Sequence, residues 1–306
     1  MVEITAGLVK ELREKSGAGM MDCKTALTEN DGNIDLSIDW LRAKGITKAA
    51  KKSDRIASEG LIGSLIKNGS AAMIELNSET DFVARNEEFQ DLLRGVLEVS
   101  IDNDELESAQ YQNTGRTVAE EINEKIATIG ENIMLRRVVT YENIEDEHIF
   151  SYTHNAVAES LGKIGVLVAI RSKAAIDNLA DFGKSLCMHI AATNPLALAS
   201  NEISPELIER EKQIAVEQAH ESGKPENIIE KMVEGRIKKF TEENALLSQI
   251  FVIDGETKIE KLLENKSSEL NEDIVITRFT RMQLGDGIEK KEEDFADEVA
   301  AVINKN

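Results

Sequence analysis

Proline, cysteine and aromatic residues are all scarce in this chain of 306 residues. It has three prolines, two cysteines and one tryptophan, and aromatic residues make up 4% of the total. So few prolines exclude long proline-rich linkers. Cys23 and Cys187 are far apart in sequence, which gives no sign of a disulfide-rich secreted domain. No apolar run reaches transmembrane length, and Met1-Val2-Glu3 does not open a signal peptide, so we expect a cytoplasmic protein.

Basic residues are outnumbered by acidic ones. The chain has 57 acidic and 36 basic residues and a formal net charge of −21. A surface this acidic repels phosphate backbones, which argues against direct nucleic-acid binding and favours fast association with a partner that carries basic patches. One basic island, with Lys48, Lys51, Lys52 and Arg55, interrupts the acidic background. We interpret it as a solvated linker helix. The alternative, an RNA contact, predicts an affinity that falls steeply with added salt.

The order of hydrophobic patterns predicts an α+β protein. A hydrophobic content of 41% and the chain length allow two domains or one multi-part unit with a sizeable core. We expect a three-helix domain and linker at 1–54, a core subdomain at 55–145, a second core subdomain at 146–283 with an inserted antiparallel helical hairpin at about 204–244, and a C-terminal helical module at 284–306.

The first 45 residues predict three short helices. Gly17-Ala18-Gly19 ends the first helix, and a turn at residues 30–33 separates the second from the third. A module this small has a thin core, so we expect it to dock on a larger part of the molecule. Met20 and Met21 are consecutive on the second helix and cannot both face the same core, so one of them should be exposed.

The predicted core is a duplication with antiparallel sheets. Asn68-Gly69 between two strand-like runs is a strong hairpin signal. The first unit reads strand, strand, helix, helix, strand, at 61–67, 71–76, 87–100, 118–129 and 133–141. The same order recurs at 148–154, 163–171, 179–192, 259–269 and 274–282.

A helix pair interrupts the second unit. Residues 205–222 and 226–244 are strongly helical and are joined by Gly223-Lys224-Pro225, which predicts an antiparallel hairpin. An apolar stripe on its second helix should be buried against the first helix or against another molecule. The stripe consists of Ile228, Ile229, Met232, Val233, Ile237 and Phe240.

Residues 75–84 lead from the second strand towards the first core helix and form a corner. Thr80, Asp81 and Phe82 place a hydroxyl, a carboxylate and a large aromatic ring in succession there, where side chains project outward from a rigid scaffold. The alternative is an ordinary helix start, with Thr80 or Asp81 as cap and Phe82 as a staple into the core. The first interpretation makes the corner a contact site, and the second makes it part of the core.

Ser78-Glu79-Thr80-Asp81-Phe82-Val83-Ala84 resembles the core motif of elongation factor Ts, the guanine-nucleotide exchange factor for elongation factor Tu. Residues 12–27 resemble the amino-terminal motif of the same family, which belongs to a domain shaped like a ubiquitin-associated (UBA) fold. The helix pair resembles the family's coiled-coil hairpin, which serves dimerisation or partner contact. Residues 287–290 and 294–296 resemble its carboxy-terminal module. These resemblances cover nearly the whole chain in family order.

The resemblance implies a function without covalent chemistry and without a cofactor or metal of its own. Such a factor binds elongation factor Tu with GDP, displaces the magnesium ion and distorts the phosphate site, so that GDP leaves and GTP enters. The hairpin would support a homodimer or a 2:2 complex. For this chain, the resemblance assigns magnesium dislocation to Thr80, Asp81, Phe82 and Val83, and further partner contacts to Arg13, Met20, Met21, His154 and Phe295.

The loop after His154 differs from the family pattern. Ser151-Tyr152-Thr153-His154 resembles the family's strand-end histidine. The family has a short turn with glycine after this residue, whereas residues 155–162 make a longer loop here. The alternative for His154 is a surface histidine with no role.

Three apparent enzyme motifs fail on their context. Gly183-Lys184-Ser185 echoes a phosphate loop but lies in a helical pattern, with Asn178 in the place of the first glycine. Asp181-Phe182-Gly183 echoes a kinase motif but lacks the lysine and the catalytic loop. Cys187 and His189 are two residues apart on a helix and diverge, so they cannot chelate one metal ion. The remaining alternative to exchange activity is an adaptor that binds through the three-helix domain.

Overall fold

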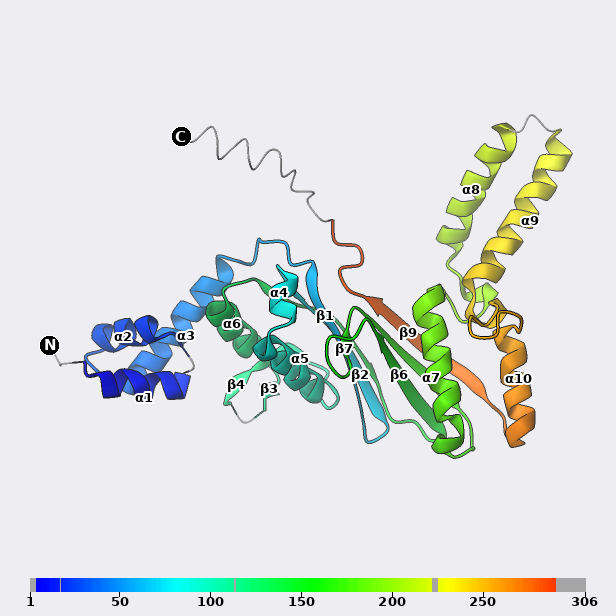
Figure 1. Cartoon of the computed structure of the whole chain (residues 1–306). Coiled ribbons are helices and arrows are strands. Elements are labelled where there is room, and N and C mark those ends of the chain that lie inside the picture. Colours follow the sequence, from blue (N-terminus) through cyan, green and yellow to red (C-terminus); the bar gives the residue numbers. More distant parts are fainter. Residues whose placement is uncertain (1–3, 17, 113, 222–224, 290–306) are drawn as a thin grey trace.

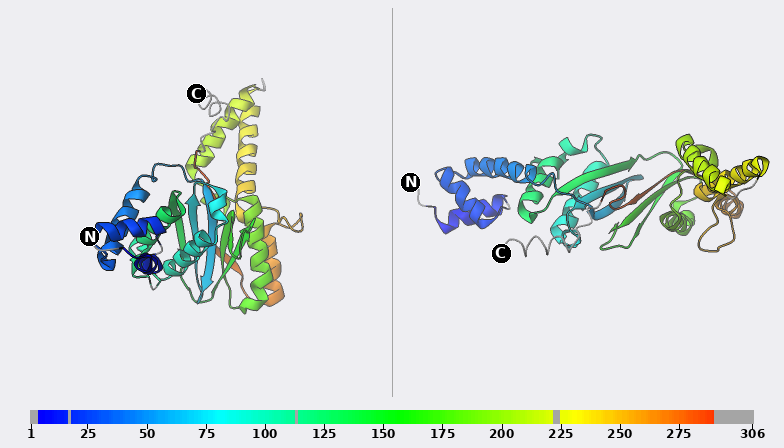
Figure 2. Two further views of the ribbon diagram at one scale, coloured as in Figure 1. Left: turned by 60° about the vertical axis from the view of Figure 1, so that its left-hand side comes forward. Right: turned by 90° about the horizontal axis from the view of Figure 1, so that it is seen from above.

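The computed structural model describes residues 4–16, 18–112, 114–221 and 225–289. Three parts follow one another along an elongated molecule (Figures 1 and 2). A three-helix module lies at one end, two β-sheets with their helices form the middle, and a helix pair projects at the other end. The fold is α+β, as predicted. No helix within these residues is long and apolar enough to cross a membrane.

The three-helix module consists of α1 (Ala6–Ser16), α2 (Met20–Glu29) and α3 (Ile34–Ala50). Gly32, at φ 79°, makes the turn before α3, and the Asn33 side chain accepts a hydrogen bond from Leu36 N at 3.0 Å. Because this side chain satisfies a free backbone donor of the first turn, it defines where α3 begins. The module's small core contains Val9, Leu12, Ala18, Cys23, Ala26, Leu27 and Leu41.

The first core unit contains the elements that the sequence predicts. Asn68 and Gly69 both have positive φ, 54° and 80°, which is the conformation that a two-residue hairpin between β1 and β2 requires. The unit comprises β1 (Glu59–Lys67), β2 (Ser70–Ser78), α4 (Asp81–Ala84), α5 (Glu87–Ser100), the short strands β3 (Gln110–Tyr111) and β4 (Arg116–Thr117), α6 (Val118–Ile129) and β5 (Ile133–Tyr141).

The second core unit repeats this order, which confirms the predicted duplication. Strand order is β5-β2-β1 in the first sheet and β9-β8-β6 in the second, so in each unit the third strand pairs with the second. Each unit also has a bulge between these two strands. The second unit comprises β6 (Glu147–His154), β8 (Ile164–Arg171), α7 (Ile176–Thr193), α10 (Ile259–Leu270) and β9 (Val275–Gln283).

The two sheets pack against each other, and the helices cover their outer faces. One buried cluster joins the sheets and includes Ile62 and Met73 of the first and Leu167 of the second. Gly165 on β8 lies so close to the first sheet that an added Cβ would sit 2.5 Å from Ile62 Cγ2. A second buried cluster lies between the first sheet and its helices, and a third lies between the second sheet and its helices. The core is therefore a four-layer arrangement of helices, sheet, sheet and helices.

The loop after His154 links the two sheets. It turns at Asn155 and Ser160, both with positive φ, and forms the short strand β7 (Leu161–Gly162). Strand β7 pairs antiparallel with β1, so it becomes the fourth strand of the first sheet, in the order β5-β2-β1-β7. The extra length of this loop relative to the family pattern thus covers the edge of β1.

The helix pair consists of α8 (Pro205–Glu221) and α9 (Glu226–Asn244). Its own core is thin and contains Ala215, Ala219, Ile229 and Val233. The predicted stripe on α9 is therefore only partly buried against α8, since Ile228 and Met232 of that stripe are exposed.

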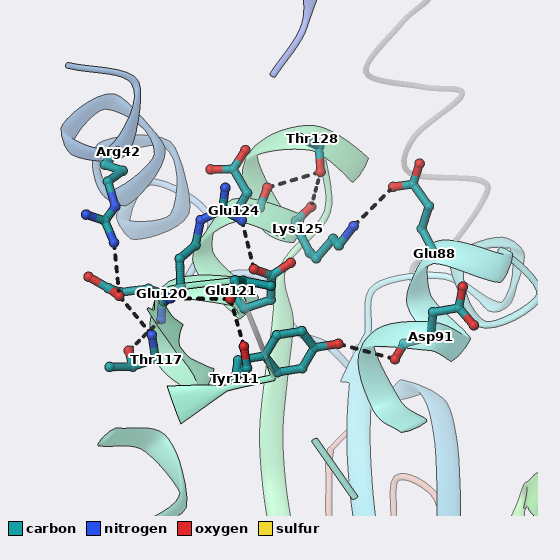
Figure 3. A network of polar contacts seen from close by, with 12 residues as sticks. Arg42, Glu88, Asp91, Tyr111, Thr117, Glu120, Glu121, Glu124, Lys125 and Thr128 are labelled. Atoms are coloured by element: carbon teal, nitrogen blue, oxygen red, sulfur yellow. Dashed lines mark hydrogen bonds and ion pairs between the residues drawn. The ribbon is translucent and has the colours of Figure 1, made fainter. Parts of the chain in front are cut away.

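Helix α3 docks on the core through α6, as expected for a module with a thin core. At Gly45 the two helices are in van der Waals range, since an added Cβ would lie 3.8 Å from Glu124 Oε2 and 3.9 Å from Ala127 Cβ. Arg42 Nη2 lies 3.4 Å from Glu120 Oε2 (Figure 3). Lys125 Nζ, 3.7 Å from Glu88 Oε2, connects α6 to α5 in the same network. Because exposed ion pairs contribute little stability, the helix contact itself holds the module in place.

The structure has separate cores for the three-helix module, for each core unit and for the helix pair. From these cores we propose the domain division predicted from the sequence, with boundaries near 54, 145 and 283. Of the predicted C-terminal module, the structure describes residues 284–289, which form turns and irregular backbone. Phe295 lies outside the described residues.

Candidate functional site

The corner predicted from the sequence lies where β2 ends and the four-residue helix α4 begins. Strand β2 ends at Ser78, and its Oγ donates to Thr80 O at 3.0 Å. Thr80 is in extended conformation at the N-cap position, but its side chain makes no capping bond to α4. Asn86, which accepts from Glu88 N at 2.9 Å, then caps the separate helix α5. The corner is thus two helix starts in close succession rather than one.

A second turn braces the corner from behind. Glu131, just after α6, accepts from Thr80 N at 2.9 Å and from Thr80 Oγ1 at 2.7 Å. In return, Glu79 Oε1 accepts from Asn132 N at 2.6 Å. Each turn therefore satisfies backbone donors of the other with a carboxylate, and hydrogen bonds to charged acceptors are among the stronger ones. The Thr80 hydroxyl fixes the corner, although through a partner that the motif does not contain.

Phe82 projects from this braced corner into solvent. Its residue surface is 78% exposed, more than that of any other large hydrophobic side chain among the described residues. Val83 and Ala84, which follow it on α4, are buried in the core of the first unit. The interpretation of Phe82 as a hydrophobic staple is therefore wrong. A large apolar side chain held outside the core by a rigid turn marks an interaction site.

Asp81 has a partner within the corner. Its Oδ2 lies 3.0 Å from Arg85 Nη2, and its side chain is 45% exposed. An exposed pair four residues apart on a helix contributes only about 0.3–0.5 kcal/mol. The carboxylate can therefore exchange Arg85 for another cation or for a water shell at little cost.

A shallow hollow opens beside the Phe82 ring. Thr80, Asp81 and Phe82 line it together with residues from β1, from the loop after His154 and from the link between β7 and β8. Lys163 Nζ, 3.2 Å from Glu59 Oε2, closes one side. The other lining residues are Glu59, Ala84, Arg85, Val157 and Lys163. Sequence reasoning missed Val157, Lys163 and Glu131 as neighbours of the corner, because they are distant in sequence.

The predicted contacts on the three-helix module lie far from the corner. Met20 and Met21 are 58% and 73% exposed, so both face solvent and not one only. Arg13 on α1 is also exposed and, with Gly19, lines a hollow between the module and α6. Figure 1 and the right-hand view of Figure 2 place α1 and α2 at the end of the molecule, away from α4. A single partner that contacts both regions must span them.

His154 is exposed at the end of β6. Its Nδ1 lies 3.0 Å from the Tyr152 hydroxyl, and its backbone oxygen accepts from Lys163 N at 3.1 Å. The side chain therefore stands at the base of the loop that carries Val157. Phe295, the remaining predicted contact, lies outside the described residues.

The cations of the basic island are partly engaged inside the chain. Lys52 Nζ donates to Ile126 O near the end of α6 at 3.3 Å. Arg55 Nη1 lies 3.4 Å from Glu79 Oε1, next to the corner. These contacts fit a linker that joins α3 to the first sheet.

The helix α7 contains the residues of the apparent enzyme motifs. Gly183 lies in the middle of α7, and an added Cβ would sit 2.3 Å from the Phe150 ring, so close packing on β6 explains this glycine. Burial raises the pKa of the Cys187 thiol. Burial lowers the pKa of His189, whose Nε2 lies 3.0 Å from Gln249 Oε1. The described residues contain no cluster of three or more metal-ligating side chains.

Comparison with known proteins identifies relatives over the full chain. The family model for elongation factor Ts matches residues 79–286. The chain is 54% identical to the elongation factor Ts of Allorhizobium ampelinum over 306 residues, which cover 99% of both chains. It is 52% identical to that of Agrobacterium fabrum, again over 99% of both chains. It is also 52% identical to that of Sphingopyxis alaskensis, over 98% of this chain and 99% of the relative.

Proposed function

The chain belongs to the elongation factor Ts family of translation elongation factors, and from this membership we propose that it is the guanine-nucleotide exchange factor of elongation factor Tu. It binds elongation factor Tu with GDP, displaces the magnesium ion and distorts the phosphate site, so that GDP leaves and GTP enters. It breaks no covalent bond. The observation that supports this proposal is the exposed Phe82 on a corner that also carries Asp81.

Exchange of this kind is differential binding. A factor that binds the nucleotide-free partner more tightly than the nucleotide-bound one must weaken nucleotide binding by the same factor. Each tenfold gain in the release rate requires about 1.4 kcal/mol of stabilisation at the release barrier. Several contacts must therefore act together, which fits a partner that spans the corner and the three-helix module.

Phe82 acts as a wedge in this proposal. Its ring enters an apolar slot on the GTPase and shifts the segment beside the magnesium site. The bonds between Thr80 and Glu131 and the buried side chain of Val83 prevent the corner from yielding instead. A rigid corner matters because a flexible one would absorb the displacement itself.

Asp81 acts on the same site through its charge. The magnesium ion of a GTPase is held by phosphate oxygens, a few side chains and water. When the carboxylate leaves Arg85, it competes for the water and the cationic groups of that site. This disturbance and the wedge would operate from the same turn of α4.

Other residues provide the remaining contact area. Arg13, Met20 and Met21 grip the GTPase from another side, and His154 and Phe295 add contacts of their own. The exposed apolar side chains of the hairpin, among them Ile228 and Met232, support a homodimer or a 2:2 complex. We also propose a cytoplasmic location, with no direct contact to nucleic acid or membrane.

The test is a release assay. The purified chain is added to elongation factor Tu loaded with a fluorescent GDP analogue, and the loss of fluorescence is followed after mixing with excess GDP. Acceleration that saturates with the concentration of the chain supports the proposal. Binding without acceleration would favour the adaptor instead, and Met21→Ala should then abolish the binding while Phe82→Ala should not.

A further inference from the structure

A fully buried carboxylate lies on the strand that leads to the corner. Glu75 on β2 has no exposed surface. Its Oε2 lies 2.9 Å from Arg136 Nη1 and is also bonded to Arg137 Nε. Its Oε1 accepts from Gly285 N at 2.8 Å and from Asn77 Nδ2 at 3.2 Å. The carboxylate is thus saturated with donors, and one of these belongs to the segment after β9.

The two arginines also hold that segment. Arg137 Nη2 donates to Gln283 O at 2.6 Å, and Arg136 Nη2 donates to Asp286 O. Three side chains of the first sheet therefore fix residues 283–286, which emerge from the second sheet. Two guanidinium groups that each bridge the buried carboxylate and a backbone oxygen form a directional clamp.

A bulge makes the clamp possible. Consecutive residues of a strand point to opposite faces of a sheet. Strands β2 and β5 shift register between Glu75 and Leu76, which pair with Arg137 and Leu135, so Arg136 is the extra residue. Because of this extra residue, both arginines reach the same side of the sheet and the same carboxylate.

We propose that Glu75 is a positioning residue, which fixes residues 284–286 against the first sheet where they leave the second, and thereby sets their place relative to the Phe82 corner. This inference rests on the proposed exchange function. Glu75 lies three residues before the end of β2, and a strand rises about 3.3 Å per residue, so the clamp and the corner are about 10 Å apart along one strand. Pairing with β1 and β5 on both sides keeps β2 rigid between them.

Gly285 completes the clamp. Its φ is +71°, a conformation that favours glycine, and an added Cβ would lie 2.7 Å from Ser58 O. The chain can pass this point only along one path. A substitution here displaces the segment while Glu75 itself is unchanged, so it tests the same contact from the other side.

The first experiment measures hydrogen exchange in the free full-length chain. In Glu75→Gln, the amide of Gly285 loses a charged acceptor, and its exchange should accelerate about ten- to hundredfold. Amides of β2 should keep their protection. Gly285→Ala should accelerate the neighbouring amides of residues 284–286, whereas Gly115→Ala, with the same φ of +71° but open space around it, should not. Unchanged protection in both Glu75→Gln and Gly285→Ala would overturn the inference.

The second experiment is a double-mutant cycle on nucleotide release from elongation factor Tu. We expect Glu75→Gln to slow release about tenfold, equivalent to about 1.4 kcal/mol. Gly285→Ala should then slow release less in the Glu75→Gln chain than in the wild-type chain, because residues 284–286 are already displaced. If the two substitutions slow release by factors that simply multiply, Glu75 acts on the corner and not on residues 284–286, and the inference is overturned. If the wild-type chain fails to accelerate nucleotide release, the proposed function is wrong. The hydrogen-exchange result still shows whether Glu75 holds residues 284–286 in place.

Discussion

Replacing Phe82 by alanine should slow nucleotide release from elongation factor Tu about 30- to 150-fold and leave this chain folded. The side chain is 78% exposed, so the folded chain loses little when it is removed. Surface substitutions of this kind usually change the free energy of unfolding by less than about 0.5 kcal/mol. The substitution therefore separates contact with the partner from stability.

The size of the effect follows from the exposed area. An aromatic side chain buries about 150–250 Å² when it is enclosed, and burial contributes roughly 25 cal/mol per Å². Enclosing the exposed part of Phe82 would thus contribute about 3–5 kcal/mol. Alanine keeps a small part of this contribution, and the cost of ordering the interface reduces the contribution further. We therefore expect Phe82→Ala to raise the release barrier by about 2–3 kcal/mol.

The assay must distinguish a wedge from a mere anchor. Release of a fluorescent GDP analogue is measured over a range of concentrations of the chain. If the Phe82 contact forms mainly at the release barrier, the saturating rate falls and the half-saturating concentration changes little. If the contact is equally strong before release, only the half-saturating concentration rises.

Two variants complete this test. Phe82→Leu keeps an apolar side chain of smaller reach and should fall between wild type and Phe82→Ala. Val275→Ala removes an exposed apolar side chain at the start of β9 and should have no effect. Wild-type release by Phe82→Ala at every concentration would refute the wedge.

Three further predictions concern groups that support the fold or the corner. Glu131→Ala removes both acceptors of Thr80 and should lower the unfolding free energy, measured by denaturant unfolding, by about 1–3 kcal/mol. It should also slow nucleotide release. Release at the wild-type rate would show that the bonds between Glu131 and Thr80 are not needed for exchange. Gly183→Ala should lower the unfolding free energy by about 1–3 kcal/mol, because the added Cβ meets the Phe150 ring. Nucleotide release should be unchanged once this variant is folded. His189 has a pKa below its usual 6.5 because of burial, so the unfolded chain takes up the proton first. The neutral His189 therefore stabilises the fold above pH 6.5, and this contribution is lost as the pH falls below that value. His189→Gln should flatten the plot of unfolding free energy against pH in this range, and an unchanged slope would contradict this prediction.

Local patterns were enough to predict nearly every element of the core. The helix at 118–129 and the strand at 133–141 have the predicted bounds, and Asn68-Gly69 makes the predicted hairpin. Such signals depend on residues that are neighbours in sequence, since apolar periodicity and turn conformation are set within a few residues. The repeated order of strands and helices then indicated the duplication.

The helix pair shows where such patterns stop. Periodicity on α9 predicted an apolar stripe, but it could not say what covers it. In the structure, α8 covers Ile229 and Val233 and leaves Ile228 and Met232 exposed. The width of the covered face depends on how two helices pack, which no single helix determines.

The amino-acid sequence by itself determined the class of fold, the order of its elements and the corner that carries Asp81 and Phe82. Only the tertiary structure decided that Glu131 braces this corner, that residues 161–162 join the first sheet, and that Glu75 clamps the segment after β9. These contacts join residues far apart in the chain. They form only when distant parts of the chain pack together, and local propensities do not encode such contacts.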